Sequence, residues 1–128
     1  ITNAVKHFKF TPRGKRRLHQ RPAESEITAC NAWLQREIEI IDPMIIVCLG
    51  ATAARAVLGR RTSVGAVRGQ FISLPRGCSV LVTAHPAAVL RAGGAAVAPG
   101  QGAEPARSAV YAGLVEDLRA VGRRLDSG

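Results

Sequence analysis

The sequence predicts an α/β fold, a three-layer α/β/α sandwich around a central parallel sheet. Apolar runs of strand length alternate with stretches in which apolar residues recur every three or four positions, as they do in amphipathic helices. Residues 44–50 (MIIVCLG) form a continuous apolar run, typical of a strand that is covered on both faces. The length of 128 residues and the 47% hydrophobic content suit one domain with one core.

The first helix is expected at 24–41. Its apolar positions recur at three- and four-residue steps, at Ile27, Cys30, Leu34, Ile38 and Ile41. Acidic and hydroxyl side chains stand near its start, and Pro43 ends it.

The other elements follow from similar patterns. Strands are expected at 1–5, 44–50, 69–74 and 78–86. Further helices are expected at 51–59, which Gly59 ends, and over a last stretch marked by Val110, Leu114, Leu118, Val121 and Leu125. Residues 6–22 are expected to form a basic loop, and residues 91–105, rich in Gly, Ala and Pro, a flexible loop.

The charge is concentrated at the start of the chain. Lys and Arg number 18 against 9 Asp and Glu, a formal charge of +9, and seven of the cations precede the first acid, Glu24. Nucleic acid is the commonest partner of such a block, although a basic protein without that role has the same composition. Residues 13–22, RGKRRLHQRP, place His19 inside this block, either as part of a solvated surface or as a functional group on a loop.

No apolar run is long enough to span a bilayer and no signal peptide is recognisable, so we expect a cytoplasmic protein without a membrane partner. The three cysteines show no disulfide framework. His7 and Cys30 could meet at a metal only if the fold brings them together. Cys48 is most simply a small core residue, and Cys78 has no evident partner.

Two polar residues lie at or near predicted strand ends, where ligands bind in sheets of this kind. His85 closes the run 78–86, either as a donor toward negative charge on a ligand oxygen or as a strand cap. Asn3 is either a turn-forming amide or a group that reads a base edge, since its carboxamide offers a donor beside an acceptor.

Four segments together resemble, in order, the C-terminal portion of the iron–sulfur uracil-DNA glycosylases. They are ITNAVKHFKF (1–10), GKRRLH (14–19), IIVCLGATAARAVLG (45–59) and VTAHPAAVLR (82–91). The third and the His-Pro motif are shared with the wider family 4. NAVKHFKF and the KRR-aliphatic-His loop are similar to the UdgX type, and nearly the whole chain, to about Arg124, is covered.

The resemblance implies a function and its residues. It implies excision of uracil from DNA, with free uracil as the product. We expect single-stranded DNA as the substrate and a monomeric protein. Asn3 matches the asparagine that binds uracil, and His85 the histidine at the uracil carbonyl. His7 and Cys30 match two ligand positions of a 4Fe–4S cluster. His19 matches the histidine that becomes covalently joined to the abasic sugar, with Lys15, Arg16 and Arg17 on the DNA backbone.

The resemblance also implies what the chain lacks. A Cys-x-x-Cys pair, a Gly-Glu-x-Pro-Gly loop and an aromatic that stacks on uracil belong to the family's N-terminal half and are not in this sequence. We therefore expect residues 1–128 to be the C-terminal part of one glycosylase domain, inactive alone, with the other cluster ligands in a preceding segment. Leu18 and Ala87 depart from the usual residues at their positions. A conventional multiple-turnover family 4 glycosylase and a non-catalytic nucleic-acid-binding module are the alternatives.

Overall fold

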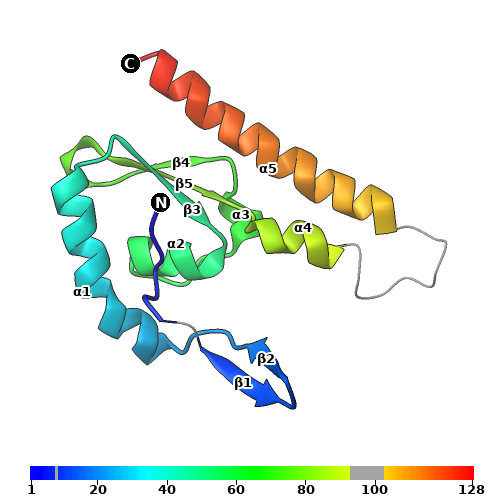
Figure 1. Ribbon diagram of the computed structural model, residues 1–128. Helices are drawn as coiled ribbons and strands as arrows, with labels where there is room; N and C mark the ends of the chain where they lie inside the picture. The colour runs from blue at the N-terminus through cyan, green and yellow to red at the C-terminus, as the bar shows by residue number, and fades with distance from the viewer. Residues whose placement is uncertain (8, 93–102) are drawn as a thin grey trace.

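A computed structural model describes residues 1–7, 9–92 and 103–128 (Figure 1). The order of elements is β1 (Phe10–Arg13), β2 (Arg16–His19), α1 (Glu24–Ile41), β3 (Ile45–Leu49), α2 (Ala51–Leu58), α3 (Val64–Val67), β4 (Phe71–Ser73), a 3₁₀ turn (Pro75–Gly77), β5 (Ser79–Thr83), α4 (Pro86–Ala92) and α5 (Ala103–Asp126). The fold is α/β, as the sequence predicts. No helix within the described ranges is long and apolar enough to cross a membrane.

The main sheet has three strands in the order β3-β5-β4. Strands β3 and β5 are parallel, in a register that pairs Ile45 with Ser79 and Leu49 with Thr83. Strand β4 is antiparallel to β5, so the sheet is mixed, and its β3–β5 pair has the parallel direction that the sequence predicts. The short turn at 75–77 explains the antiparallel direction of β4, because a connection of that length can join neighbouring strands only when they are antiparallel.

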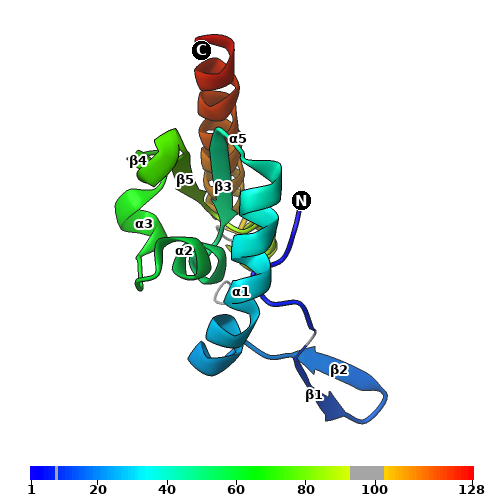
Figure 2. The ribbon, with the colours of Figure 1, turned by 90° about the vertical axis from the view of Figure 1, so that its left-hand side faces the viewer.

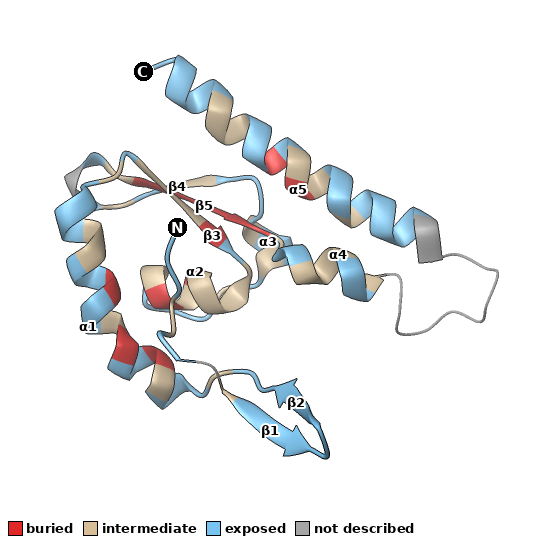
Figure 3. Cartoon of the chain, viewed as in Figure 1, coloured by how far each residue is buried: buried red, intermediate tan, exposed pale blue. Residues whose placement is uncertain are grey.

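Helices cover both faces of this sheet. Helices α1 and α2 lie on one side of the strands and α5 lies on the other (Figures 1 and 2). Every residue of the central strand β5 is buried (Figure 3). Cys48, Ala54, Val80 and Val82 form one core cluster.

The predicted apolar faces of the two long helices are only partly covered. On α1, Ile27, Cys30 and Leu34 are buried, but Ile41 is exposed. On α5, Leu114 is buried, but Leu118 and Leu125 are exposed.

The N-terminal segment is not the strand expected at 1–5. Residues 1–7 form an extended and bent stretch outside both sheets. Side-chain contacts hold this stretch in place, and not hydrogen bonds to a neighbouring strand. Ala4 and Val5 pack between α1 and α2, against a second core cluster formed by Ile27, Leu34 and Ala56. Lys6 Nζ donates to Glu37 Oε2 of α1 at 2.7 Å.

The basic segment 6–22 is more ordered than the expected loop. Its centre is an antiparallel hairpin, β1 and β2, whose two-residue turn has Gly14 at φ 59°. Positive φ at the first turn position is the type II′ pattern that suits hairpin twist, and glycine adopts it without a Cβ penalty. Pro12 is tolerated because each strand of a two-stranded sheet has an open edge.

Both ends of the glycine-rich segment 91–105, which the sequence predicts as a loop, are helical. Arg91 and Ala92 belong to α4, and residues 103–105 belong to α5. The stretch between them lies outside the described residues.

Candidate active site

His85 lies at the carboxyl edge of the parallel pair β3 and β5. The register ends both strands at the same level, so Gly50 after β3 and His85 after β5 are neighbours there. The N–H of Gly50 donates to the Thr83 carbonyl at 2.9 Å, and a Cβ on Gly50 would stand 3.1 Å from His85 Cβ. His85 therefore lies near a strand end, as predicted, although the strand is shorter than the expected 78–86, because β5 ends at Thr83 and Pro86 begins α4.

The His85 ring has a defined hydrogen-bonding role. Its Nδ1 accepts the N–H of Ala87 at 3.0 Å, in the first turn of α4. A neutral imidazole that accepts at Nδ1 carries its proton on Nε2. The side chain is exposed, so His85 presents an Nε2–H donor at this edge.

His19 shares one face of the hairpin with an arginine and an aromatic ring. It pairs with Phe10 in the strand register, and alternation along β2 puts Arg17 on the same face. The Arg17 guanidinium lies over the Phe10 ring, 4.8 Å from its centroid. Lys15 is in the exposed turn, and the exposed Arg16 lies on the opposite face. The hairpin thus carries cations on both faces and His19 at its base.

That base is fastened to α1. Gln20 N–H donates to the Lys9 carbonyl at 2.9 Å, and Lys9 Nζ pairs with Glu26 Oε2 at 2.9 Å. Glu26 also accepts the N–H of Ala23 at 2.6 Å, one half of a capping box. The hydrogen bond from Ala23 and the contact with Lys9 lower the pKa of the Glu26 carboxyl.

His7 and Cys30 are brought together, as a shared metal site requires. Both line one hollow of about 380 Å³ between the N-terminal segment and α1, together with Trp33 and Glu37. The Lys6 N–H donates to Cys30 Sγ at 3.5 Å. Within the described ranges no group of three or more His, Cys, Asp or Glu side chains that could hold a metal ion occurs, at this hollow or elsewhere.

The other two cysteines lie elsewhere. Cys48 is buried in the core, and burial raises the pKa of its thiol to about 12. Burial also raises the pKa of the Cys78 thiol, with a smaller contribution from the nearby Asp42 charge. Cys48 is therefore a small core residue, as the sequence predicts, and neither thiol lines the hollow shared by His7 and Cys30.

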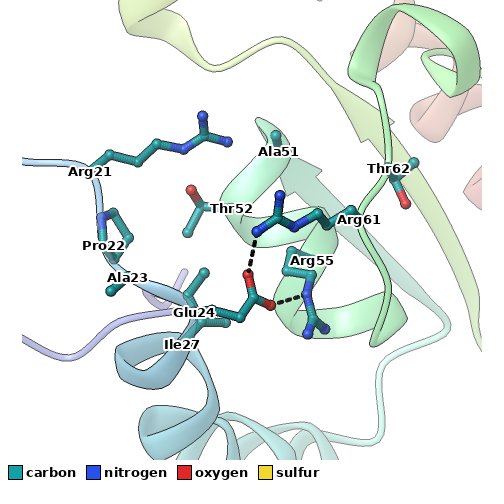
Figure 4. Close-up of a pocket in the computed structure, with 10 residues that line it drawn as sticks. All are labelled: Arg21, Pro22, Ala23, Glu24, Ile27, Ala51, Thr52, Arg55, Arg61 and Thr62. Carbon is teal, nitrogen blue, oxygen red and sulfur yellow. Dashed lines mark ion pairs between the residues drawn. The ribbon is translucent and has the colours of Figure 1, made fainter.

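A second hollow, of about 360 Å³, lies between the start of α1 and the start of α2 (Figure 4). Arg21, Arg55 and Arg61 line it, and Glu24 pairs with the last two. The sequence does not mark Arg55 or Arg61 as site residues, because Arg55 lies within α2 and Arg61 follows it, both far from the basic block in the chain. Their spacing in the sequence does not indicate a shared site, because only the packing of α1 against α2 brings them to one hollow.

Asn3 lies on the N-terminal segment, exposed, just before the residues that pack between α1 and α2. It is not at a strand end, so that part of the expectation is wrong. The described residues thus form separate groups: His85 with Gly50, His19 with Arg17, and His7 with Cys30.

Comparison with known proteins gives these groups a context. The model of the uracil DNA glycosylase superfamily matches residues 1–119. Among similar proteins are Type-4 uracil-DNA glycosylases. The one from Thermotoga maritima is 42% identical over 71 residues, which is 55% of this chain and 37% of the relative.

Two archaeal relatives agree with this. The Type-4 uracil-DNA glycosylase of Saccharolobus solfataricus is 41% identical over 76 residues, 54% of this chain and 35% of the relative. That of Archaeoglobus fulgidus is 38% identical over 76 residues, 54% of this chain and 38% of the relative. The matched region spans little more than a third of each relative. Because the superfamily match extends over most of the chain, the chain belongs to the uracil DNA glycosylase superfamily.

Proposed function

We propose that the protein containing this chain excises uracil from DNA and becomes covalently joined, through His19, to the sugar that remains. The observation that carries the excision step is the Nε2–H donor of His85 at the carboxyl edge of β3 and β5. Membership of the superfamily and similarity to proteins named Type-4 uracil-DNA glycosylase support the same reaction.

The proposed chemistry needs donors aimed at uracil oxygens. Uracil leaves as an anion, so a donor that strengthens its contact as charge develops lowers the barrier. His85 supplies an N–H, and Asn3 supplies a carboxamide that can pair with a base edge. The base must first leave the stack, which costs least in single-stranded DNA.

The hairpin is proposed to hold the DNA backbone and deliver His19. Lys15, Arg16 and Arg17 are exposed cations suited to phosphate contacts. As the C1′–N1 bond breaks, its electron pair leaves with uracil, and an imidazole nitrogen of His19 forms a bond to C1′ in place of water. The uracil anion takes up a proton and the alkylated imidazolium loses its ring N–H proton, so no further reactant is needed.

The cluster proposal rests on His7 and Cys30. Their shared hollow fits one side of a 4Fe–4S cluster, and an N–H donor to a cysteine sulfur, as from Lys6 to Cys30, suits a thiolate ligand. Such a cluster would brace the hairpin against α1, because His7 leads into β1. The other ligands are proposed to come from outside the described residues.

A multiple-turnover glycosylase is the second candidate, since the relatives compared above are named Type-4 enzymes. There His19 would be a bystander and water would take the sugar carbon. The two candidates differ in product, and both use Asn3 and His85 as the groups that contact uracil.

One experiment separates them. The full-length protein is incubated with end-labelled, single-stranded DNA that holds one uracil, and free uracil and a denaturing gel are both read. A shifted band that survives denaturant, equal in amount to the uracil released, supports the proposal. Free abasic DNA in excess of enzyme supports the second candidate. Binding without uracil release would indicate a nucleic-acid-binding module and overturn both.

A further inference from the structure

A buried carboxylate joins α5 to the end of β5. Asp117 is 5% exposed, and its Oδ2 accepts two hydrogen bonds, from Thr83 Oγ1 at 2.5 Å and from Arg68 Nη2 at 2.9 Å. Thr83 is the last residue of β5 and is fully buried. The Arg68 backbone bridges Val82 of the same strand. The three side chains thus form one network at the carboxyl edge of the sheet.

This network leads directly to the candidate active site. The Thr83 carbonyl accepts the N–H of Gly50 at 2.9 Å, and Gly50 is in close approach to His85. His85 follows Thr83 by two residues. One residue, Thr83, is therefore held by α5 through its hydroxyl and holds the β3–α2 connection through its carbonyl.

The network fits beside two glycines, whose lack of a side chain makes room for Asp117 and Arg68. A Cβ on Gly69 would stand 2.8 Å from Asp117 Oδ1, and a Cβ on Gly113 would stand 2.9 Å from the Arg68 Cζ. A buried charge is costly, and an apolar contact could fasten α5 more simply. The packing around Asp117 is thus shaped to admit a carboxylate and its arginine.

We infer that Asp117 is a positioning residue for His85, acting through Thr83, and that Arg68 holds Asp117 in place. The inference rests on the proposed excision reaction. The network fixes the end of β5, the end of β5 fixes the start of the His85–Pro86 turn, and the ring must be placed closely for its donor to act on a developing charge.

Two pairs of variants of the full-length protein test this. Thr83→Val removes the hydroxyl at nearly constant volume, and Thr83→Ser restores it. Gly113→Ala pushes the Arg68 guanidinium away from Asp117 without changing a charged residue, and alanine favours a helix. Gly122→Ala is the matched control on the same helix, because a Cβ there meets nothing within 4 Å. Asp117→Asn removes the charge itself.

The measured quantities are the single-turnover rate of uracil release, the DNA dissociation constant and the melting temperature. We expect a fall in rate of ~10-fold or more for Thr83→Val and Asp117→Asn, and ~3-fold for Gly113→Ala, with DNA binding within about twofold. Thr83→Ser and Gly122→Ala keep the parent rate. Parent rates in Thr83→Val, or equal losses in Gly113→Ala and Gly122→Ala, would overturn the inference.

A second measurement keeps the test independent of activity. The ¹⁵N shifts of the His85 ring are expected to change in Thr83→Val and Gly113→Ala but not in Gly122→Ala. If the parent protein releases no uracil, the proposed function fails, and the ring shifts alone decide the inference. Unchanged shifts in both variants, whatever the activity, would show that the network does not reach His85.

Discussion

Gly50 lies so close to His85 that a methyl group in its place would be in tighter contact with the histidine than ordinary van der Waals packing allows. Its φ is 88°, and a Cβ atom built on it would stand 3.1 Å from His85 Cβ. The parallel register of β3 and β5 brings these two residues together, although 35 positions separate them in the sequence. The contact means that the turn before α2 helps to define where the histidine can lie.

Gly50→Ala is expected to slow uracil excision. The new methyl group requires the His85 side chain to shift by a few tenths of an ångström. Because a misplacement of about 1 Å can cost ~100-fold in rate, a shift of this size is expected to cost several-fold. The backbone of Gly50, with φ 88° and ψ 173°, lies in a region essentially limited to glycine, which adds roughly 1–3 kcal/mol of strain. Gly59→Ala is the control, because Gly59 has φ 71° and nothing within 4 Å of its Cβ position. Equal activities of the two variants at equal stability would show that the contact with His85 has no role.

Cys30→Ala is expected to abolish the iron content of the full-length protein. The Cys30 sulfur shares a hollow with His7 and accepts the Lys6 N–H, whereas the Cys78 thiol lies elsewhere with its pKa raised by burial. Iron and sulfide analysis of the purified variant checks this, with Cys78→Ser as the control that keeps the visible chromophore. Full iron and sulfide in Cys30→Ala would exclude Cys30 as a ligand.

Glu26→Gln is expected to make the stability of the protein fall less steeply as the pH is lowered below about 4.5. The pKa of Glu26 is lowered from the ordinary value of 4.5 by the Ala23 N–H and by Lys9. Its contribution to the free energy of unfolding is therefore complete above about pH 4.5 and is lost as the pH falls through the lowered pKa. Melting temperatures between about pH 6 and pH 3 measure this.

The control is Glu39→Gln, which breaks only an exposed pair with Arg36 and should keep the parent pH dependence. A Glu26→Gln profile parallel to that of the parent would mean that the carboxylate does not fasten the hairpin base.

The sequence was most informative where local patterns decide the structure. The helix at 24–41 and the strand inside 44–50 are confirmed, because apolar period, capping residues and Pro43 all act within a few positions. The sequence does not predict the hairpin, because proline and glycine residues such as Pro12, Gly14 and Pro22 occur both in irregular loops and in tight turns. Only the pairing of β1 with β2 shows that this segment is a hairpin.

Long-range contacts carried no such signal. Asp117 belongs to a helix whose pattern places it among ordinary polar positions, and only packing against β5 reveals its bond to Thr83. The antiparallel direction of β4 likewise depends on the turn at 75–77. The prediction of His85 near a strand end is confirmed because it lies two residues after Thr83, where β5 ends.

His19→Ser is expected to abolish the covalent DNA adduct while uracil release continues, since Asn3 and His85 remain. Serine brings no comparable nucleophile, so water takes the sugar carbon and free abasic DNA accumulates over repeated turnovers.

Two neighbours in β2 sharpen this test. Leu18→Ser alters the opposite face of the hairpin and should keep the adduct. Arg17→Ala removes the guanidinium from the Phe10 ring and one cation from the His19 face, so it should weaken DNA binding, reduce its salt dependence and lower the adduct yield through placement of the strand. The decisive quantity is adduct formed per uracil released. A ratio near one in His19→Ser would mean that another residue makes the bond, whereas a ratio near zero there, beside the parent ratio in Leu18→Ser, assigns the bond to the histidine.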